Sequence, residues 1–96
     1  MNDRELLRKI GFKIRAERVR TGLTQECLAE LAAIHWKTMG RIERGEFSFS
    51  ITIFSRLAQH LEVNPAELLG NLEKPDAKRA SRIIKALARK RSLSKI

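Results

Sequence analysis

A short stretch near the middle of the chain carries aromatic, basic and hydroxyl side chains on one helical face: Trp36, Lys37, Thr38 and Arg41. Met39 and Ile42 lie between them at helical spacing and are expected to point inward. Lysine and arginine supply positive charge and several hydrogen-bond donors, which suits the binding of an acceptor-rich partner. The helix that carries these side chains is predicted to begin near His35 and to end at Arg44, where Gly45 can adopt a left-handed cap.

A second predicted helix precedes this one and must position it. Thr24 is predicted to cap its start, because the hydroxyl can accept a hydrogen bond from an unpaired backbone N–H. Apolar residues then repeat at helical spacing: Leu28, Leu31 and Ala32, with Ala29 beside them. Ala33 and Ile34 leave room only for a tight turn before the next helix. Two short helices joined in this way, the second with a basic outer face, form a helix-turn-helix.

From about Leu6 to Gly70 the chain resembles the phage Cro and repressor type of helix-turn-helix regulator, the large XRE-like family. The matching residues, in the family's order and spacing, are Ile10-Gly11-x-x-Ile14-Arg15-x-x-Arg18, Gly22-Leu23-Thr24-Gln25-Glu26, Leu28-Ala29, Arg41-Ile42-Glu43-Arg44-Gly45, Leu57-Ala58, Leu61, Val63 and Leu68-Leu69. The resemblance implies a five-helix, repressor-like domain that binds double-stranded DNA and reads it through the second helix of the motif.

By this resemblance, one set of residues is expected to reach base edges in the major groove: His35, Trp36, Lys37 and Arg41. Arg41 would bridge O6 and N7 of a guanine, whereas Trp36 either packs on DNA or is partly buried against its own fold. Another set is expected to contact phosphates: Gln25, Thr24, Thr38 and Arg44. Gln25 lies in the first turn of a helix, whose positive end favours an anion, although a solvated surface glutamine is the alternative.

Arg18 follows Ile14 by one helical turn and therefore places a charge on the apolar side of the first helix. Family members with this arginine pair it with the glutamate found here at Glu43, so the resemblance implies a structural ion pair between Arg18 and Glu43. The alternative is an arginine whose stem packs while its head reaches water.

The chain departs from the family pattern at three places. Cys27 stands where an acidic residue usually completes a capping box. Ala33 stands where the turn usually has a left-handed glycine, a substitution that costs about 1 kcal/mol, so a slightly rearranged turn is expected. In the loop that follows the helix predicted over residues 35–44, Phe47 and Phe49 replace the usual polar residue and proline. One of the two is expected to close the core.

The remaining sequence predicts an all-α domain without strands. The first helix is predicted over residues 3–21, with Asp3 as its cap and an inward stripe made of Leu6, Leu7, Ile10, Ile14 and Val19. Ser50 is predicted to cap a fourth helix that leaves Arg56 outside and turns inward Phe54, Leu57, Ala58 and Leu61.

Asn64 followed by Pro65 predicts the start of a fifth helix, which Gly70 ends. The helix-turn-helix domain is thus expected to span residues 1–70. In repressors of this type two subunits meet near the last core helix, which makes the candidates for a homodimer interface Val63, Pro65, Ala66 and Leu69.

Catalytic and metal sites are not expected. Cys27 is the only cysteine, and neither His35 nor His60 has neighbours at metal-ligand spacing. No cofactor, metal or enzymatic activity is predicted. A single cysteine and the absence of an N-terminal apolar stretch favour a reducing, cytoplasmic setting with no membrane contact.

The net charge of +9 is concentrated in the last quarter of the chain. Residues 1–73 carry eleven Lys and Arg against ten Asp and Glu, whereas residues 74–96 carry nine against one. Within the expected linker and tail, residues 71–96, an amphipathic helix is predicted, with an apolar stripe of Ala77, Ala80, Ile83, Ile84, Leu87 and Ala88 and a basic face of Lys78, Arg79, Arg82, Lys85, Arg89 and Lys90.

Three uses of this helix compete: packing on the body or on a second subunit, binding of DNA phosphates beside the operator, or binding of an acidic protein or a membrane. Packing is favoured, with the basic face adding nonspecific DNA affinity.

The sequence therefore predicts a sequence-specific transcriptional regulator, a homodimer that reads an inverted repeat through residues 35–44. Small size without an effector domain fits phage-type repressors and the controller proteins of restriction–modification systems. Repression and activation through RNA polymerase both stay open. The alternative is an antitoxin whose helix-turn-helix binds its operon while residues 71–96 mask a toxin.

Overall fold

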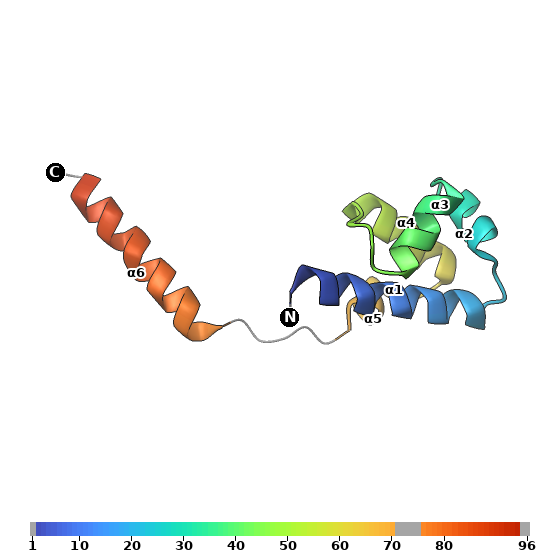
Figure 1. Cartoon of the computed structure of the whole chain (residues 1–96), viewed down its shortest axis with the longest axis horizontal. Coiled ribbons are helices and arrows are strands. Elements are labelled where there is room, and N and C mark those ends of the chain that lie inside the picture. The colour runs from blue at the N-terminus through green and yellow to red at the C-terminus, as the bar shows by residue number, and fades with distance from the viewer. Residues whose placement is uncertain (1, 71–75, 95–96) are drawn as a thin grey trace.

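The computed structural model describes residues 2–70 and 76–94 of the 96-residue chain, and every regular element in these ranges is a helix. The helices are α1 (Asp3–Arg20), α2 (Gln25–Leu31), α3 (Trp36–Glu43), α4 (Ile51–Leu61), α5 (Pro65–Leu69) and α6 (Ala77–Ser94) (Figure 1). The predicted all-α class, with five repressor-like helices and an additional C-terminal basic helix, is confirmed.

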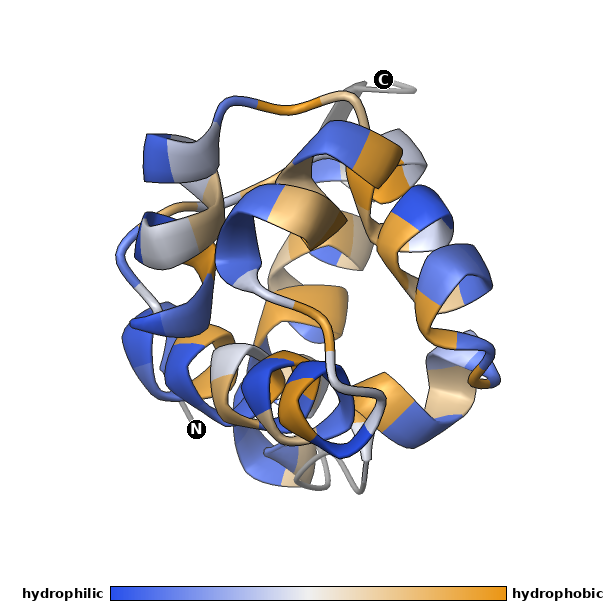
Figure 2. Cartoon of the chain, turned by 90° about the vertical axis from the view of Figure 1, so that its right-hand side faces the viewer, coloured by the Kyte–Doolittle hydropathy of each residue, from blue (hydrophilic) through white to orange (hydrophobic). Residues whose placement is uncertain are grey.

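Helices α1 to α5 enclose one hydrophobic core, and hydrophobic and hydrophilic stretches alternate along their ribbons (Figure 2). Its fully buried large side chains come from all five helices: Ile14, Leu28, Met39, Ile42, Leu57, Leu61 and Leu68. Met39 and Ile42 therefore point inward as predicted. Burial of such side chains removes apolar surface from water, and this is the main term that stabilises a small domain.

Three of the predicted helix caps are confirmed and one is wrong. The side chains of Thr24, Ser50 and Asn64 each accept a hydrogen bond from a backbone N–H in the first turn of the helix that follows. At α1 the cap is Asn2 rather than Asp3, because Asn2 is extended and its carbonyl oxygen Oδ1 accepts from the backbone N–H of Glu5 at 2.8 Å. Asp3 is already the first helical residue.

Two residues of the predicted inward stripes are exposed. Val19 is 60% exposed because the buried face of α1 continues from Ile14 to Arg18, one turn on, and Val19 points about 100° away from it. Leu31 is 44% exposed, since the buried face of α2 is centred between Ala29 and its C-cap, Ala32. The inward-facing positions on these two helices are taken by the polar Arg18 and by the small Ala29 and Ala32.

Helices α1 and α3 cross at backbone contact (Figure 1). A Cβ atom added to Gly11 would lie 2.3 Å from the carbonyl oxygen of Ile42 and 2.7 Å from that of Glu43. No other residue type fits there without a shift of one helix. Gly11 therefore brings the end of α3 directly onto α1.

Helix α6 begins at a cap formed by Asp76, whose Oδ1 accepts from the backbone N–H groups of Lys78 and Arg79. Every described side chain from residue 76 to residue 90 is exposed, including the apolar stripe, of which Ile84 is 65% exposed. The favoured packing of this stripe on the body is thus not seen within the single chain. No helix among the described residues is long and apolar enough to cross a membrane.

Candidate nucleic-acid interface

The turn between α2 and α3 has the left-handed residue that the motif requires. Ala33 adopts φ 58°, and the backbone N–H of Ile34 reaches back to the carbonyl oxygen of Ala29 at 2.9 Å. His35 then caps α3, because its ring nitrogen Nδ1 accepts from the backbone N–H of Lys37 at 3.1 Å. The chain therefore keeps the left-handed turn with alanine in place of glycine.

Arg56 supports this turn from α4, a contact that the sequence did not predict. Its Nε donates to the carbonyl oxygen of Ala32 at 2.8 Å, at the end of α2, and the side chain is partly buried rather than outside as expected. As the C-cap of α2, Ala32 has no intrahelical partner for its carbonyl, and Arg56 supplies the hydrogen bond instead. Since Arg56 is 24 positions away from Ala32, helical periodicity alone carried no signal for the pairing.

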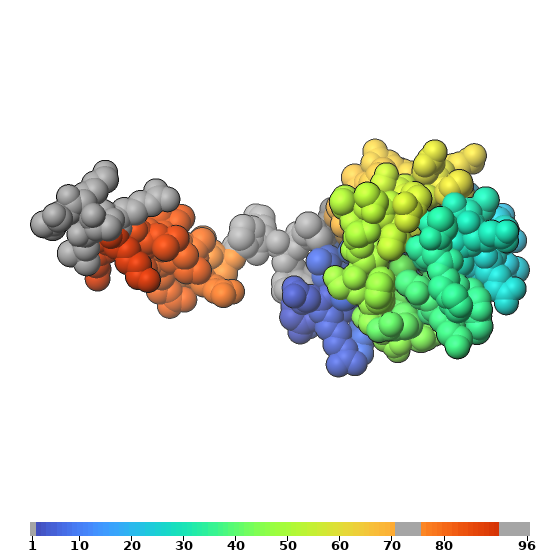
Figure 3. All heavy atoms as spheres, turned by 90° about the horizontal axis from the view of Figure 1, so that it is seen from above, coloured from blue at the N-terminus to red at the C-terminus, as the bar shows by residue number. Residues whose placement is uncertain are grey.

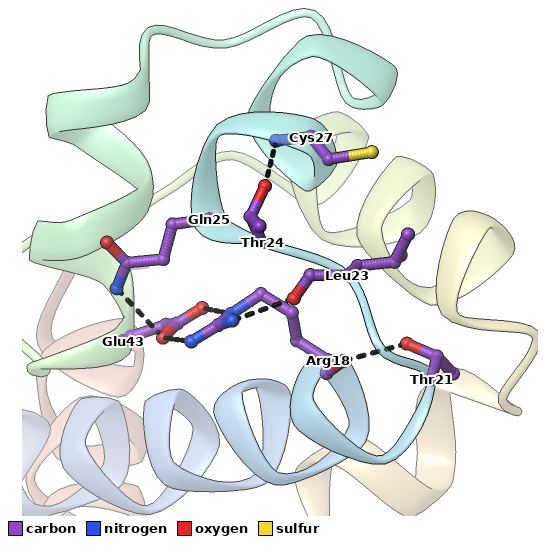
Figure 4. A network of polar contacts seen from close by, with 7 residues as sticks. All are labelled: Arg18, Thr21, Leu23, Thr24, Gln25, Cys27 and Glu43. Carbon is purple, nitrogen blue, oxygen red and sulfur yellow. Dashed lines mark hydrogen bonds and ion pairs between the residues drawn. The ribbon is translucent and has the colours of Figure 1, made fainter.

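A polar network fixes the end of α3 to α1 (Figure 4). The guanidinium of Arg18 donates to both carboxylate oxygens of Glu43, from Nε at 2.6 Å and from Nη2 at 3.0 Å. The third guanidinium nitrogen, Nη1, donates to the carbonyl oxygen of Leu23 at 2.8 Å. Hydrogen bonding to Glu43 raises the pKa of Arg18, against the opposing effect of burial. The structure thus brings together the two residues of the expected ion pair.

Gln25 joins the same network from the start of α2. Its Nε2 donates to Oε1 of Glu43 at 3.0 Å, so one amide N–H is engaged inside the protein while the side chain stays partly exposed (Figure 4). The amide group has a second N–H that can face outward. Glu43 therefore orients Gln25 as well as Arg18.

Beside this network, α2 and α3 form a shallow hollow of about 280 Å³, lined by Gln25, Trp36, Lys37, Gly40, Arg41 and Arg44. Trp36 is 51% exposed, with its ring stacked on His35 at 5.7 Å between centroids and Nζ of Lys37 lying 5.7 Å from the ring centre. The hollow presents cationic donors and one aromatic face. Such groups match the hydrogen-bond acceptors and methyl groups of base edges.

Arg41 is held in place by the loop that follows α3. Its guanidinium lies 5.2 Å from the ring centre of Phe47, and Nη2 approaches the carbonyl oxygen of Glu46 at 3.4 Å. Phe49 instead packs on Phe54, with ring centroids 5.9 Å apart. The sequence predicts that one loop phenylalanine closes the core. In the structure both Phe47 and Phe49 are partly buried against it. Phe47 also orients a residue of the candidate reading surface, which the sequence did not indicate.

A family model described as a helix-turn-helix domain matches residues 9–69. The restriction-modification controller protein C.AhdI from Aeromonas hydrophila is 37% identical, covers 65% of this chain and 94% of its own, and has a TM-score of 0.63. The chain belongs to the XRE-like helix-turn-helix family of DNA-binding transcriptional regulators. Members of this family are regulators and not enzymes.

Two further structures resemble this XRE-like protein. The restriction-modification controller protein C.Esp1396I is 31% identical, covers 67% of this chain and 86% of its own, and has a TM-score of 0.61. A chain of the SinR–SinI protein complex is 26% identical, covers 81% of this chain and 78% of its own, and has a TM-score of 0.62. No match was found among curated proteins.

The remaining candidate phosphate-binding residues of this XRE-like protein differ in how free their polar groups are to contact DNA. The hydroxyl oxygen of Thr24 accepts from the backbone N–H of Cys27 at 3.0 Å, which leaves its proton to donate outward. Thr38 is half-buried, and Nε of the exposed Arg44 lies 3.1 Å from a carboxylate oxygen of Glu46. A phosphate contact by Arg44 therefore competes with an intramolecular ion pair.

The candidate dimer residues lie at and around α5. Val63 and Leu69 are partly buried against the core, whereas Pro65 and Ala66 are exposed. Only part of this set is thus free for a second subunit. Within residues 2–70 and 76–94, no cluster of His, Cys, Asp and Glu could hold a metal ion.

Proposed function

We propose that this XRE-like protein is a homodimeric, sequence-specific transcriptional regulator that reads an inverted-repeat operator through α3. The observation that carries the proposal is the exposed hollow on α2 and α3, where Gln25, Lys37 and Arg41 present donors on one surface. Arg41 would contact a guanine, and Trp36 would pack beside it on the groove. Gln25 and Thr24 at the start of α2, with Thr38 and Arg44 on α3, would bind phosphates.

A dimer is proposed because one α3 presents a short face and contacts only a few base pairs. The two subunits would meet at Pro65 and Ala66, with Val63 and Leu69 at the rim, and the dimer would read two half-sites about one helical turn of DNA apart. The similarity to C.AhdI and C.Esp1396I, both restriction-modification controller proteins, supports a transcriptional regulator.

The test is a titration of the full-length protein against DNA from immediately upstream of its own gene, with a scrambled duplex of the same length as the control. Salt must be held at a fixed, near-physiological concentration, because phosphate contacts make affinity strongly salt-dependent. A preference of about a thousandfold or more for the upstream duplex is expected. Equal binding to both duplexes would contradict sequence-specific reading of this DNA.

The second candidate is an antitoxin, and one observation favours it. The apolar stripe of α6, which includes Ile83, Ile84 and Leu87, is exposed in the single chain and is available to a protein partner. A toxin gene adjacent to this one, whose product forms a stoichiometric complex with the chain that depends on residues 76–94, would establish this function. Without such a gene, α6 is assigned to the regulator itself.

A further inference from the structure

A second hollow, of about 420 Å³, lies where the start of α1 meets the end of α3. Its lining residues are Arg4, Leu7, Arg8, Arg44, Gly45 and Glu46. The lining therefore contains three arginines and one glutamate, which gives it a net charge of +2. In Figure 3 the blue start of α1 lies beside the yellow-green segment that follows α3.

The hollow forms because the chain after α3 approaches α1 at backbone contact. Gly45 has φ 73°, and a Cβ atom added to it would lie 2.7 Å from the Cα atom of Arg8. Arg4 and Arg8 are four positions apart in α1, so they share one helical face, and both are exposed. Among the described residues neither forms an ion pair, whereas Arg44 pairs with Glu46. Two unpaired arginines, Arg4 and Arg8, therefore line the same hollow as the paired Arg44.

Arg44 lines this hollow and also the hollow of the candidate reading surface. The two hollows thus share one lining side chain. The loop from Glu46 to Ser50 contains no lysine or arginine, so the positive charge beside the end of α3 comes from α1 instead. A polyanion lying along α3 would meet Arg4 and Arg8 next.

We propose that Arg4 and Arg8 bind a phosphate of the DNA backbone next to the base pairs read by α3. This inference rests on the proposed DNA-reading function and extends the protein–DNA contact beyond the helix-turn-helix. Guanidinium groups suit a phosphate because they donate parallel hydrogen bonds to its oxygens. Contacts of this kind set register and affinity but carry no base preference.

The test measures affinity of full-length R4Q, R8Q and the double variant for the upstream duplex and for the scrambled duplex over a series of salt concentrations. Loss of this one phosphate contact should make the slope of log K against log salt shallower by about 0.9 in the double variant, and by less in each single variant. Affinity should fall by the same factor on both duplexes, so their ratio should stay constant.

The matched control is R20Q, which removes the same charge from the exposed far end of α1, where Arg20 pairs with Glu17. Its slope should equal that of the wild type. An R4Q/R8Q slope equal to the R20Q slope would overturn the phosphate contact, and a changed ratio between the duplexes would indicate a base contact instead. The failure of the proposed function is separate, because it appears in the wild type as equal binding to both duplexes.

Discussion

The guanidinium of Arg18 on α1 forms two hydrogen bonds with the carboxylate of Glu43 at the end of α3, across 25 positions of sequence. The Arg18 side chain is 12% exposed and that of Glu43 is 2% exposed. Removal of one partner from such a buried pair leaves the other charge without compensation. Glu43→Ala also removes the acceptor of Gln25, so we expect it to lower the free energy of unfolding by roughly 3–5 kcal/mol.

The measurement is urea denaturation of E43A, R18A and the double variant as a cycle. The double variant should be destabilised by less than the sum of the single variants, because the charges are then removed together. The exposed pair between Arg20 and Glu17 is the control, and R20A should change stability by about 1 kcal/mol or less. Additive effects at Arg18 and Glu43 would show that the pair is not energetically coupled.

The Cβ atom of Ala33 makes its left-handed conformation sterically strained, whereas glycine adopts this conformation without that strain. Ala33→Gly should therefore raise the free energy of unfolding by about 1 kcal/mol without changing the core. Glu62 has nearly the same φ, 57°, at the end of α4, and Glu62→Gly should have a similar effect away from the reading surface. A lower urea midpoint for A33G would mean that the alanine side chain makes a stabilising contact at this turn.

Arg41 is expected to read one base pair. Arg41→Ala should relax base preference at one operator position, with a loss of about 1–3 kcal/mol of discrimination there. Selection from randomised duplexes measures this directly. Phe47→Leu is the companion variant: since the ring lies under the guanidinium, its loss should weaken preference at that same position by less. If base preference were unchanged in R41A, Arg41 would not have the proposed role.

The two faces of α6 can be separated by substitution. Ile83→Ser with Leu87→Ser removes apolar surface but keeps every charge, and it should weaken self-association if a second subunit covers the stripe. Lys78→Gln with Arg82→Gln removes charge but keeps the stripe, and it should weaken binding to the scrambled duplex. Sedimentation and duplex titration measure the two effects. If neither pair changed either quantity, α6 would contribute to neither.

Local signals in the sequence were sufficient for much of the fold. Thr24, Ser50 and Asn64 could be predicted as caps because a cap depends on only a few adjacent residues. Met39 and Ile42 could be assigned to the core from helical spacing. Val19 and Leu31 were assigned wrongly, since the neighbouring helix decides which part of an apolar stripe is covered.

The contacts that complete the candidate site were harder to predict. Arg56 supports the α2–α3 turn, and Phe47 lies under Arg41, yet neither has a periodic or motif signal. Both depend on how a later segment folds back over α2 and α3. The hollow between α1 and Gly45 arises in the same way, because it requires a backbone approach that only the assembled domain shows.

The close crossing at Gly11 makes the part of the molecule that carries the candidate reading surface rigid. Because α3 rests backbone to backbone on α1 and is tied there by Glu43, its tilt cannot change independently of the rest of the domain. The domain should meet each half-site as a rigid template. Any mismatch in groove width or spacing must then be absorbed by the duplex, so operators that bend easily should bind more tightly than stiff ones with the same contacted bases.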